Sequence, residues 1–468
     1  MAGGLLWAGF RGETGQVAEP SNVTTARASI EVGRAARRRV SRSSLGVWEA
    51  AADRGDPIGV LERQAASRVP ELVPIRYGRM AAGPFAFLRG APAIMAADLA
   101  AWPNTGLDVQ LCGDAHLSNF GLYASPERVL VFDLNDFDET LPGPFEWDVK
   151  RLVASVAVAA RANGFSASDA QAAVLAAARR YRVTMRRLAE LDEMSVWYER
   201  VEAEAAVALV RARKRRKGVE KAISKARAST SLQALDKLTE PGPDGTPRIR
   251  SQPPLLVPIE KPDAAVIDQL FTDYRETLSE DRRVLLERHR ILDIARKVVG
   301  VGSVGTRCFI VLLAGQHYGS PLFIQVKEAE ESVLAPHLKP SEFHHHGHRV
   351  VNGQRLIQAA SDIFLGWASG SDQRSYYLRQ LRDMKGSAVV ENMSRAVLRG
   401  YATLCGHTLA RAHARSGGRV AIAAYLGASD AFERAMGEFA IAYADQTIAD
   451  HDALLAAIAS GRIEAAEG

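Results

Sequence analysis

The feature that most constrains this chain is a set of acidic and amide side chains on loops between short predicted strands. The segment Gly-Asp-Ala-His-Leu-Ser-Asn, residues 113–119, follows the strand-forming run Asp-Val-Gln-Leu-Cys. Two more strands are predicted at 120–123 and 128–134, and the second runs into Phe-Asp-Leu-Asn-Asp-Phe-Asp-Glu, residues 132–139. Asp and Asn also form turns and cap helices. A spaced set on loops after strands favours a binding or catalytic site over that simpler use.

These side chains are the ones that phosphoryl transfer requires. The reaction needs a carboxylate that orients or deprotonates the attacking group, and oxygen ligands that hold Mg²⁺ on the nucleotide phosphates. Asp114 offers the carboxylate, and Asn119 lies five residues later on the same loop. Asp133, Asp136 and Asp138 follow in the next segment. The sequence therefore predicts a site that binds a metal ion and a nucleotide.

A second motif lies nearly two hundred residues further along the chain. The run Val299–Thr306 contains the pattern G-x-G-x-x-G, and its candidate phosphate-binding residues are Gly300, Gly302, Ser303 and Gly305. An apolar run and the predicted strand Leu322–Lys327 follow. The pattern alone fits a Rossmann helix start or a glycine-rich turn with a surface lysine. The order of loop, strand and Lys327 instead favours backbone N–H groups and a lysine that hold nucleotide phosphates.

The rest of the chain is mainly helical. Helical spacing covers three long stretches, about 46–104, 146–238 and 395–457. Within the first, Pro92–Ala100 is predicted as a buried helix that leads to the acidic loop. A further helix is predicted around Ile291–Lys297, before the glycine pattern. The breaker-rich run 239–245 is predicted as a linker, and no fixed-period repeat indicates a solenoid.

Composition excludes several classes of protein. With 47% hydrophobic and 24% charged residues, the 468-residue chain is folded rather than disordered. A net charge of +5 over 59 basic and 54 acidic residues does not indicate a nucleic-acid binder. Three cysteines without a CxxC pair favour a reducing compartment. No signal peptide or apolar window of roughly 18 residues is present, so we expect a soluble, cytoplasmic protein without a membrane partner.

The acidic segments resemble the kinase-like superfamily, particularly its aminoglycoside, choline and methylthioribose kinases. In that branch a Gly-Asp-x-x-x-x-Asn loop precedes a strand that ends in Asp, and a second Asp opens a helix twelve residues later, which matches Asp136 and Asp148. The resemblance implies that Asp114 is the catalytic base, that Asn119 and Asp136 bind Mg²⁺ in preference to Asp133, and that Asp148 braces the loop. Cys112 stands where the family usually has His.

The glycine motif also resembles kinases, in which the lysine usually pairs with a glutamate on the next helix. Four glutamates are available for Lys327, and the choice among them stays open: Glu328, Glu330, Glu331 and Glu342. The run Tyr376–Leu381 resembles the strand that leads to the hinge between kinase lobes. Kinases place the glycine loop before the catalytic loop, whereas this chain inverts that order. The resemblance therefore implies a circularly permuted kinase-like fold.

The chain as a whole resembles the uncharacterised bacterial family DUF2252, which carries the blocks G-D-A-H-L-S-N-F-G, F-D-L-N-D-F-D-E and Q-V-K-E-A. We expect an α+β, two-lobed fold with a large helical lobe and a smaller β-rich nucleotide-binding lobe. The expected parts are a loosely ordered segment 1–45, a helical lobe 46–285 with the catalytic loop, a β-rich lobe 286–394, and C-terminal helices 395–468 that pack on the helical lobe.

The expected function is ATP- and Mg²⁺-dependent phosphoryl transfer to an unidentified small molecule or protein. Adenylyl transfer and a non-catalytic nucleotide-binding pseudokinase are the alternatives. A third alternative is RNA binding through the basic run 211–227, for which a solvated helix face is the simpler interpretation. The histidines at 344–348 are given no role. Arg89 and several later arginines either bind phosphate or pair with acidic residues.

Overall fold

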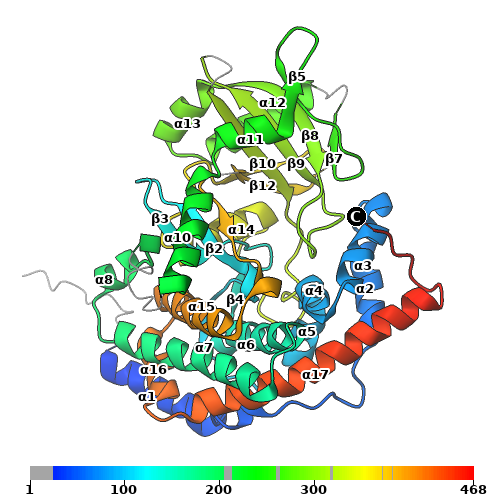
Figure 1. Cartoon of the computed structure of the whole chain (residues 1–468). Coiled ribbons are helices and arrows are strands. Elements are labelled where there is room, and N and C mark those ends of the chain that lie inside the picture. Colours follow the sequence, from blue (N-terminus) through cyan, green and yellow to red (C-terminus); the bar gives the residue numbers. More distant parts are fainter. Residues whose placement is uncertain are drawn as a thin grey trace, which may run out of the picture.

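The computed structural model describes residues 25–204, 213–259, 264–316, 320–371, 373–381 and 383–467, and its fold is α+β. Helices form the lower part of the molecule in Figure 1. Their bounds are α1 (Ala26–Arg39), α2 (Pro57–Ala65), α3 (Val73–Ala81), α4 (Pro84–Gly90), α5 (Pro92–Ala100), α6 (Phe145–Ala162), α7 (Ala167–Leu188), α8 (Glu193–Tyr198), α15 (Arg395–Ser416), α16 (Arg419–Leu426) and α17 (Ala431–Ala459). Helix α6 lies at the centre, buried along nearly its whole length and packed against α7, α15 and α17. The predicted helix Pro92–Ala100 is confirmed as α5.

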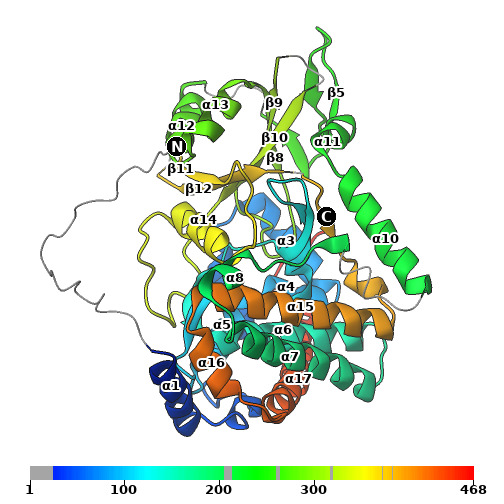
Figure 2. The same cartoon turned by 90° about the vertical axis from the view of Figure 1, so that its left-hand side faces the viewer.

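An antiparallel six-stranded sheet forms the upper part in Figures 1 and 2, in the order β11-β12-β10-β9-β8-β7. The strands are β7 (Leu256–Pro258), β8 (Arg290–Lys297), β9 (Cys308–Ala314), β10 (Pro321–Glu328), β11 (Gly366–Ser369) and β12 (Ser375–Gln380). Because side chains alternate along a strand, Val311 and Leu313 pack with α12 (Ala264–Glu276) and α13 (Glu280–Glu287). Ile310 and Leu312 pack on the other face with α11 (Ser231–Leu238). Both faces of the sheet are thus covered.

Short strands at the boundary between these two parts carry the loops of interest. Strand β1 (Asp108–Leu111) pairs with β4 (Leu141–Pro144), and β2 (Phe120–Ala124) pairs with β3 (Leu130–Leu134) and β13 (Gly386–Ser387). The loop 113–119 therefore runs from β1 to β2, and the segment 135–140 runs from β3 to β4. The remaining elements are α10 (Arg213–Ala228), α14 (His346–Ile357), β5 (Thr239–Pro241), β6 (Pro247–Ile249) and the 3₁₀ turns Ser44–Gly46, Pro70–Leu72, Leu117–Asn119 and Val390–Asn392.

Two predicted elements are wrong. Ile291–Lys297, predicted as a helix, lies in strand β8, because hydrogen bonds to β7 and β9 on either side outweigh a local preference for helix. The run 239–245, predicted as a linker, forms part of the β5–β6 hairpin. The expected boundary at 286 also falls too late, since α11, α12 and α13 pack on the sheet and belong to the β-rich part.

The segment 1–45, expected to be loosely ordered, contains helix α1; residues 1–24 lie outside the described residues. Helix α1 packs on α16, and Gly33 lies so close that a Cβ there would be 2.0 Å from the Ala421 carbonyl oxygen. Arg37 and Arg42 donate to the carbonyls of Tyr425 and Leu426, at 2.8 and 2.7 Å. The basic run thus satisfies the carbonyl end of α16, where positive charge is favoured. Among the described residues, no helix is long and apolar enough to cross a bilayer.

Candidate active site

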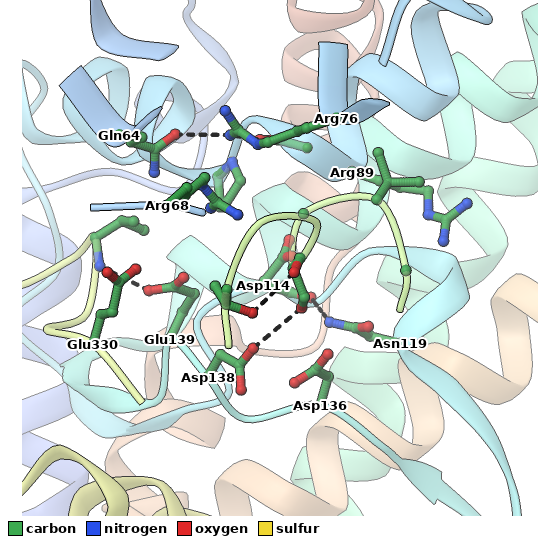
Figure 3. Close-up of a pocket in the computed structure, with 18 of the residues that line it drawn as sticks. Gln64, Arg68, Arg76, Arg89, Asp114, Asn119, Asp136, Asp138, Glu139 and Glu330 are labelled. Atoms are coloured by element: carbon green, nitrogen blue, oxygen red, sulfur yellow. Dashed lines mark hydrogen bonds between the residues drawn. The ribbon is translucent and has the colours of Figure 1, made fainter. Parts of the chain in front are cut away.

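A cavity of about 440 Å³ lies where the two parts of the molecule meet (Figure 3). It brings together segments that are far apart in the sequence: the loop 113–119, the segment 136–139 and the glycine loop 300–306. The predicted site residues that line it are Asp114, Asn119, Asp136, Gly300, Gly302 and Ser303. We call Asp114, Asn119, Asp136 and Asp138 the acidic wall of this cavity.

The shape of the loop 113–119 depends on Gly113 and Asp148. Gly113 has a φ of +85°, and a Cβ at this position would lie 2.2 Å from the Glu139 carbonyl oxygen, so only glycine fits. The fully buried Asp148 carboxylate, in the first turn of α6, accepts hydrogen bonds from Cys112 N at 2.8 Å and Gly113 N at 3.1 Å. Asp148 makes the bracing contacts that the kinase resemblance implied.

Helix α15 supplies a histidine behind this loop. His413 Nε2 lies 3.1 Å from Asp148 Oδ2, and His413 Nδ1 lies 2.9 Å from the Tyr181 hydroxyl. A carboxylate only accepts hydrogen bonds, so His413 Nε2 carries a proton, and in the neutral ring Nδ1 accepts from Tyr181. The motif has Cys112 in place of the family's usual histidine, and here a histidine from a distant part of the chain supports the loop.

Asp114 sits on the cavity with two neighbours that the sequence analysis did not identify. Arg151 Nε donates to Asp114 Oδ1 at 2.8 Å, and His116 Nε2 lies 3.5 Å from Asp114 Oδ2. Burial lowers the pKa of His116 to about 4, so its ring is neutral at pH 7. Asn119 donates its amide nitrogen to the Asp114 carbonyl at 2.6 Å. Arg151 follows Asp148 by three residues, which puts both side chains on one face of α6. This spacing could have identified Arg151 from the sequence as a neighbour of the loop.

Lys327, on β10, reaches the acidic wall from the sheet. Its side chain is only 2% exposed, lies 3.7 Å from Asp136 Oδ2 and forms a closer ion pair with Asp138. The Tyr377 hydroxyl also donates to Asp138, at 2.8 Å. Lys327 therefore meets two carboxylates of the segment 136–139, although 189 residues separate it from Asp138.

The surroundings of Asp136 and Asp138 shift the pKa values of the two carboxylates in opposite directions. Burial opposes ionisation of Asp136, but Lys327, Arg379 and Lys385 together lower its pKa to about 2. Burial and the neighbouring Asp136 raise the pKa of Asp138. Asp136 Oδ1 is a buried acceptor without a hydrogen-bond donor among the described residues. A charged carboxylate with a free oxygen on a cavity suits a metal ligand.

Asp133, the other candidate metal ligand, does not face the cavity. Its side chain is buried and forms an ion pair with the equally buried Arg411 of α15. Asp133 Oδ2 accepts from Ala359 N at 2.8 Å. The prediction that Asp133 binds metal conflicts with this geometry, because its carboxylate is already used within the fold. Its position on β3 turns it toward α15, whereas Asp136 lies beyond the end of the strand.

Among the described residues, none of the four glutamates considered as partners lies within ion-pair distance of Lys327. Glu328 instead forms ion pairs with Arg307 and Arg374, at 3.3 and 2.9 Å. Helix α14, which follows β10, presents Arg349, whose guanidinium donates to the carbonyls of Thr140, Asp138 and Glu330 at 2.6 to 2.8 Å. Among the residues described, the carboxylates within ion-pair distance of Lys327 are those of Asp136 and Asp138. The segment 136–139 thus takes the place that the resemblance assigned to a glutamate.

The glycine loop lies between β8 and β9 and rests against the helical part. Val69 N donates to the Gly305 carbonyl at 2.8 Å, and Arg79 donates to the Gly300 carbonyl at 2.6 Å. Gly305 has a φ of +91°, which favours glycine. Ser303 Oγ lies 3.4 Å from Asp138 Oδ2. Backbone contacts therefore hold the loop over the cavity.

Three arginines form the opposite side of the cavity, and we call Arg68, Arg76 and Arg89 its basic wall. Arg68 lies on the turn after α2, Arg76 on α3 and Arg89 on α4. In Figure 3 Arg68 and Arg76 lie above Asp136 and Asp138, and Arg89 lies to the right of them. Sequence analysis singled out only Arg89, because arginines are too common in this chain for Arg68 and Arg76 to stand out.

The remaining sequence candidates lie elsewhere. His345 caps α14, accepting from His348 N at 3.1 Å, and His348 stacks on Trp367. In the part of the chain that the structure describes, no three His, Cys, Asp or Glu side chains are grouped as a metal cluster. The basic run 211–227 lies mostly in α10, and residues 211–212 fall outside the described residues.

Comparison with known proteins identifies one family. A family model described as an uncharacterized protein conserved in bacteria, DUF2252, matches residues 68–457. No curated protein and no solved structure matches the chain. The match includes every residue of both cavity walls.

Proposed function

The chain belongs to the DUF2252 family, whose description names no activity, and we propose that it is an ATP- and Mg²⁺-dependent phosphotransferase. The observation that carries this proposal is the meeting of Asp114, Asn119, Asp136 and the glycine loop on one cavity, with Lys327 paired to Asp136. Phosphoryl transfer depends on positioning and charge stabilisation, and these groups supply both.

In this proposal each group has a distinct task. Backbone N–H groups of the glycine loop and the ammonium of Lys327 hold the nucleotide phosphates, and Lys327 exchanges a carboxylate for a phosphate as its partner. Asp114 orients the acceptor hydroxyl and takes up its proton. Arg151 holds Asp114 in place through the 2.8 Å contact, and Asp148 fixes the loop from behind.

The residues present fit a magnesium ion. Asp136 Oδ1 is an unsatisfied buried oxygen, and the bond from Asn119 Nδ2 to the Asp114 carbonyl turns the amide oxygen of Asn119 away from that bond. Mg²⁺ commonly takes one or two protein ligands together with phosphate oxygens and water, so it requires no cluster of acidic residues. When bound, Mg²⁺ would neutralise charge on the phosphates.

We further propose that the fold is kinase-like, two-lobed and circularly permuted. The antiparallel sheet with its glycine loop between β8 and β9 and Lys327 on β10 has the character of a nucleotide-binding lobe. The helical part with the loop 113–119 would be the second lobe. The chain passes from β12 back to α15 through residues 381–394, which supports a hinge there.

Calorimetric titration of the full chain with ATP tests nucleotide binding. We expect saturable binding that requires Mg²⁺ and that Asp136→Ala abolishes. Asp445→Ala, which removes a 69% exposed carboxylate of α17, is the matched control and should bind as wild type. If the wild-type protein binds no nucleotide with Mg²⁺ present, the proposal is wrong.

Labelled nucleotide separates the proposed reaction from its alternatives. Incubation with ATP labelled at the γ phosphate should label acceptors in a bacterial extract, and Asp114→Asn should prevent this. Labelling from the α phosphate instead would indicate adenylyl transfer. Binding without either label would indicate a pseudokinase.

A further inference from the structure

The guanidinium groups of the basic wall have no carboxylate partner among the described residues, although Arg68 donates to the Val304 carbonyl. Arg76 is fully buried, and its Nε and Nη1 atoms have no hydrogen-bond acceptor among the described residues. Its Nη2 atom donates to Gly90 O at 3.0 Å and to Gln64 Oε1 at 3.1 Å, both uncharged acceptors. The Nε atoms of Arg68 and Arg89 are likewise buried and unpaired within the described part of the chain. Donors that face a cavity without acceptors indicate a ligand that supplies them.

Several other arginines that are buried or nearly so in the described part of the chain are paired with carboxylates. Arg182 forms an ion pair with Glu433 at 2.7 Å, and Arg54 pairs with Asp98 and Asp450. In the described ranges no carboxylate lies within ion-pair distance of Arg68, Arg76 or Arg89. Burying a cation without a counter-charge is costly. Arg349, which is also buried and has no carboxylate partner among the described residues, donates to three backbone carbonyls instead, whereas the three arginines of the basic wall line the cavity.

Electrostatics agree with this geometry. Burial lowers the pKa of all three arginines, that of Arg76 to about 9, with Arg68 acting in the same direction. Glu330 and Glu139 face Arg68 from a greater distance, and burial raises the pKa of Glu139 to about 7. The nearest acidic groups thus compensate the wall only partly, and an anion would complete it.

The basic wall also lies beside the reacting groups. The Asp114 carboxylate raises the pKa of Arg89, and Arg89 contributes to the lowered pKa of His116. The backbone of Arg89 lies against the glycine loop, since a Cβ at Gly302 would be 3.2 Å from the Arg89 carbonyl oxygen. A molecule with an anionic group at the arginines can therefore extend toward Asp114 within the same cavity.

We propose that the acceptor is a small anionic molecule whose phosphate or carboxylate group binds Arg68, Arg76 and Arg89 while its hydroxyl faces Asp114. This rests on the proposed phosphotransferase function. The hydroxyl oxygen bonds to the γ-phosphorus, the bond between that phosphorus and the bridging β–γ oxygen breaks, ADP leaves, and the hydroxyl proton passes to Asp114. Guanidinium groups suit this role because their fork matches two oxygens of one anion. The rival source of the anion is the nucleotide's own phosphate chain.

Calorimetry with inorganic phosphate as the probe distinguishes these sources. Phosphate is titrated into the full chain, with and without a saturating non-hydrolysable ATP analogue and Mg²⁺, and the analogue is titrated separately. We expect phosphate to bind in both cases. Arg89→Gln should weaken phosphate binding by about 10- to 100-fold, since hydrogen bonds to charged groups contribute about 1.5–3 kcal/mol, and should leave nucleotide affinity within about twofold.

Two variants complete the test. Arg63→Gln removes an exposed arginine of α2 that does not line the cavity and should change neither affinity. Arg76→Gln should weaken phosphate binding at least as much as Arg89→Gln, and thermal unfolding checks that it folds, since Arg76 also bonds to Gly90 and Gln64. Arg89 has no such bonds to other described residues, so its variant carries the test if Arg76→Gln unfolds.

Three results would overturn the inference. Absence of saturable phosphate binding would show that the arginines hold no anion. If the ATP analogue prevents phosphate from binding, and Arg89→Gln weakens the binding of both ligands equally, the arginines bind the nucleotide's own phosphates and not an acceptor. If the protein binds phosphate through the arginines but binds no nucleotide, both the acceptor role and the proposed function are wrong. If the protein binds nucleotide but not phosphate, only the inference about the arginines is wrong.

Discussion

The two walls of the cavity balance their charges in opposite ways. On the acidic wall each aspartate has a cation from the chain itself, Arg151 at Asp114 and Lys327 at Asp136 and Asp138. On the basic wall the guanidinium groups face the cavity with no carboxylate of the described residues in ion-pair distance. The aspartates of the acidic wall lie on loops between short strands, whereas Arg76 and Arg89 lie on α3 and α4 and Arg68 lies on the turn after α2.

This difference teaches which charges support the fold and which await a ligand. A buried charge that is paired with an opposite charge can contribute to the stability of the fold. An unpaired buried charge lowers stability and persists where function needs it. Substitutions that remove a charge should therefore destabilise the protein on and behind the acidic wall but not on the basic wall. Four predictions test this contrast, from the largest expected effect to the smallest.

Asp133→Asn should have the largest effect. It leaves Arg411 buried without its counter-charge behind the acidic wall, which should lower the free energy of unfolding by about 3–5 kcal/mol. Urea denaturation measures this change. Asp383→Asn, which removes the partner of the exposed Arg128, should cost less than about 1 kcal/mol. Equal small effects for both variants would show that Asp133 does not support the fold.

Lys327→Met should lower the free energy of unfolding by about 2–3 kcal/mol at pH 7, because it leaves two neighbouring carboxylates without their shared cation. Burial and Asp136 already raise the pKa of Asp138, so Asp138 takes up a proton readily in this variant. The loss should accordingly shrink at pH 5. A loss that stays constant between the two pH values would contradict the shared-cation account.

Glu139 should make stability depend on pH. Its folded-state pKa is raised from 4.5 to about 7 by burial, so the folded protein binds the proton more tightly than the unfolded chain. Its contribution is present below pH 4.5 and is lost as pH rises through 7, by roughly 2 kcal/mol between pH 5 and 7. Denaturation across this range should show a flatter profile for Glu139→Gln, whereas Glu342→Gln, on an exposed residue, should retain the wild-type slope.

Arg89→Met should have the smallest effect on stability. The substitution removes a half-buried cation whose buried Nε has no hydrogen-bond acceptor among the described residues, and it keeps an apolar side chain of similar length. The free energy of unfolding should therefore stay the same or rise by up to about 1 kcal/mol. Thermal and urea unfolding measure this directly. A loss as large as that of Lys327→Met would mean that Arg89 is compensated within the fold and would remove the contrast between the walls.

Local sequence patterns predicted much of the fold. Helix Pro92–Ala100 and the strand after residue 321 follow from apolar spacing and from flanking breakers. The wrong prediction of a helix at Ile291–Lys297 has a physical cause. Hydrogen bonds to β7 on one side and β9 on the other outweigh the helical preference of the Ala, Arg and Lys residues in this segment. Helix α1 was missed because its packing surface lies on α16, some four hundred residues away.

The sequence by itself placed the acidic candidates in two short segments, because the spacing of Asp114, Asn119, Asp133, Asp136 and Asp138 is visible without a structure. Only the tertiary structure decided that Asp133 turns inward to Arg411, that Lys327 meets Asp136 and Asp138 rather than a glutamate, and that Arg68, Arg76 and Arg89 share a cavity with them. These facts depend on contacts between residues far apart in the chain. Whether a charge is buried, and whether it then has a partner, is decided only when those distant segments pack together.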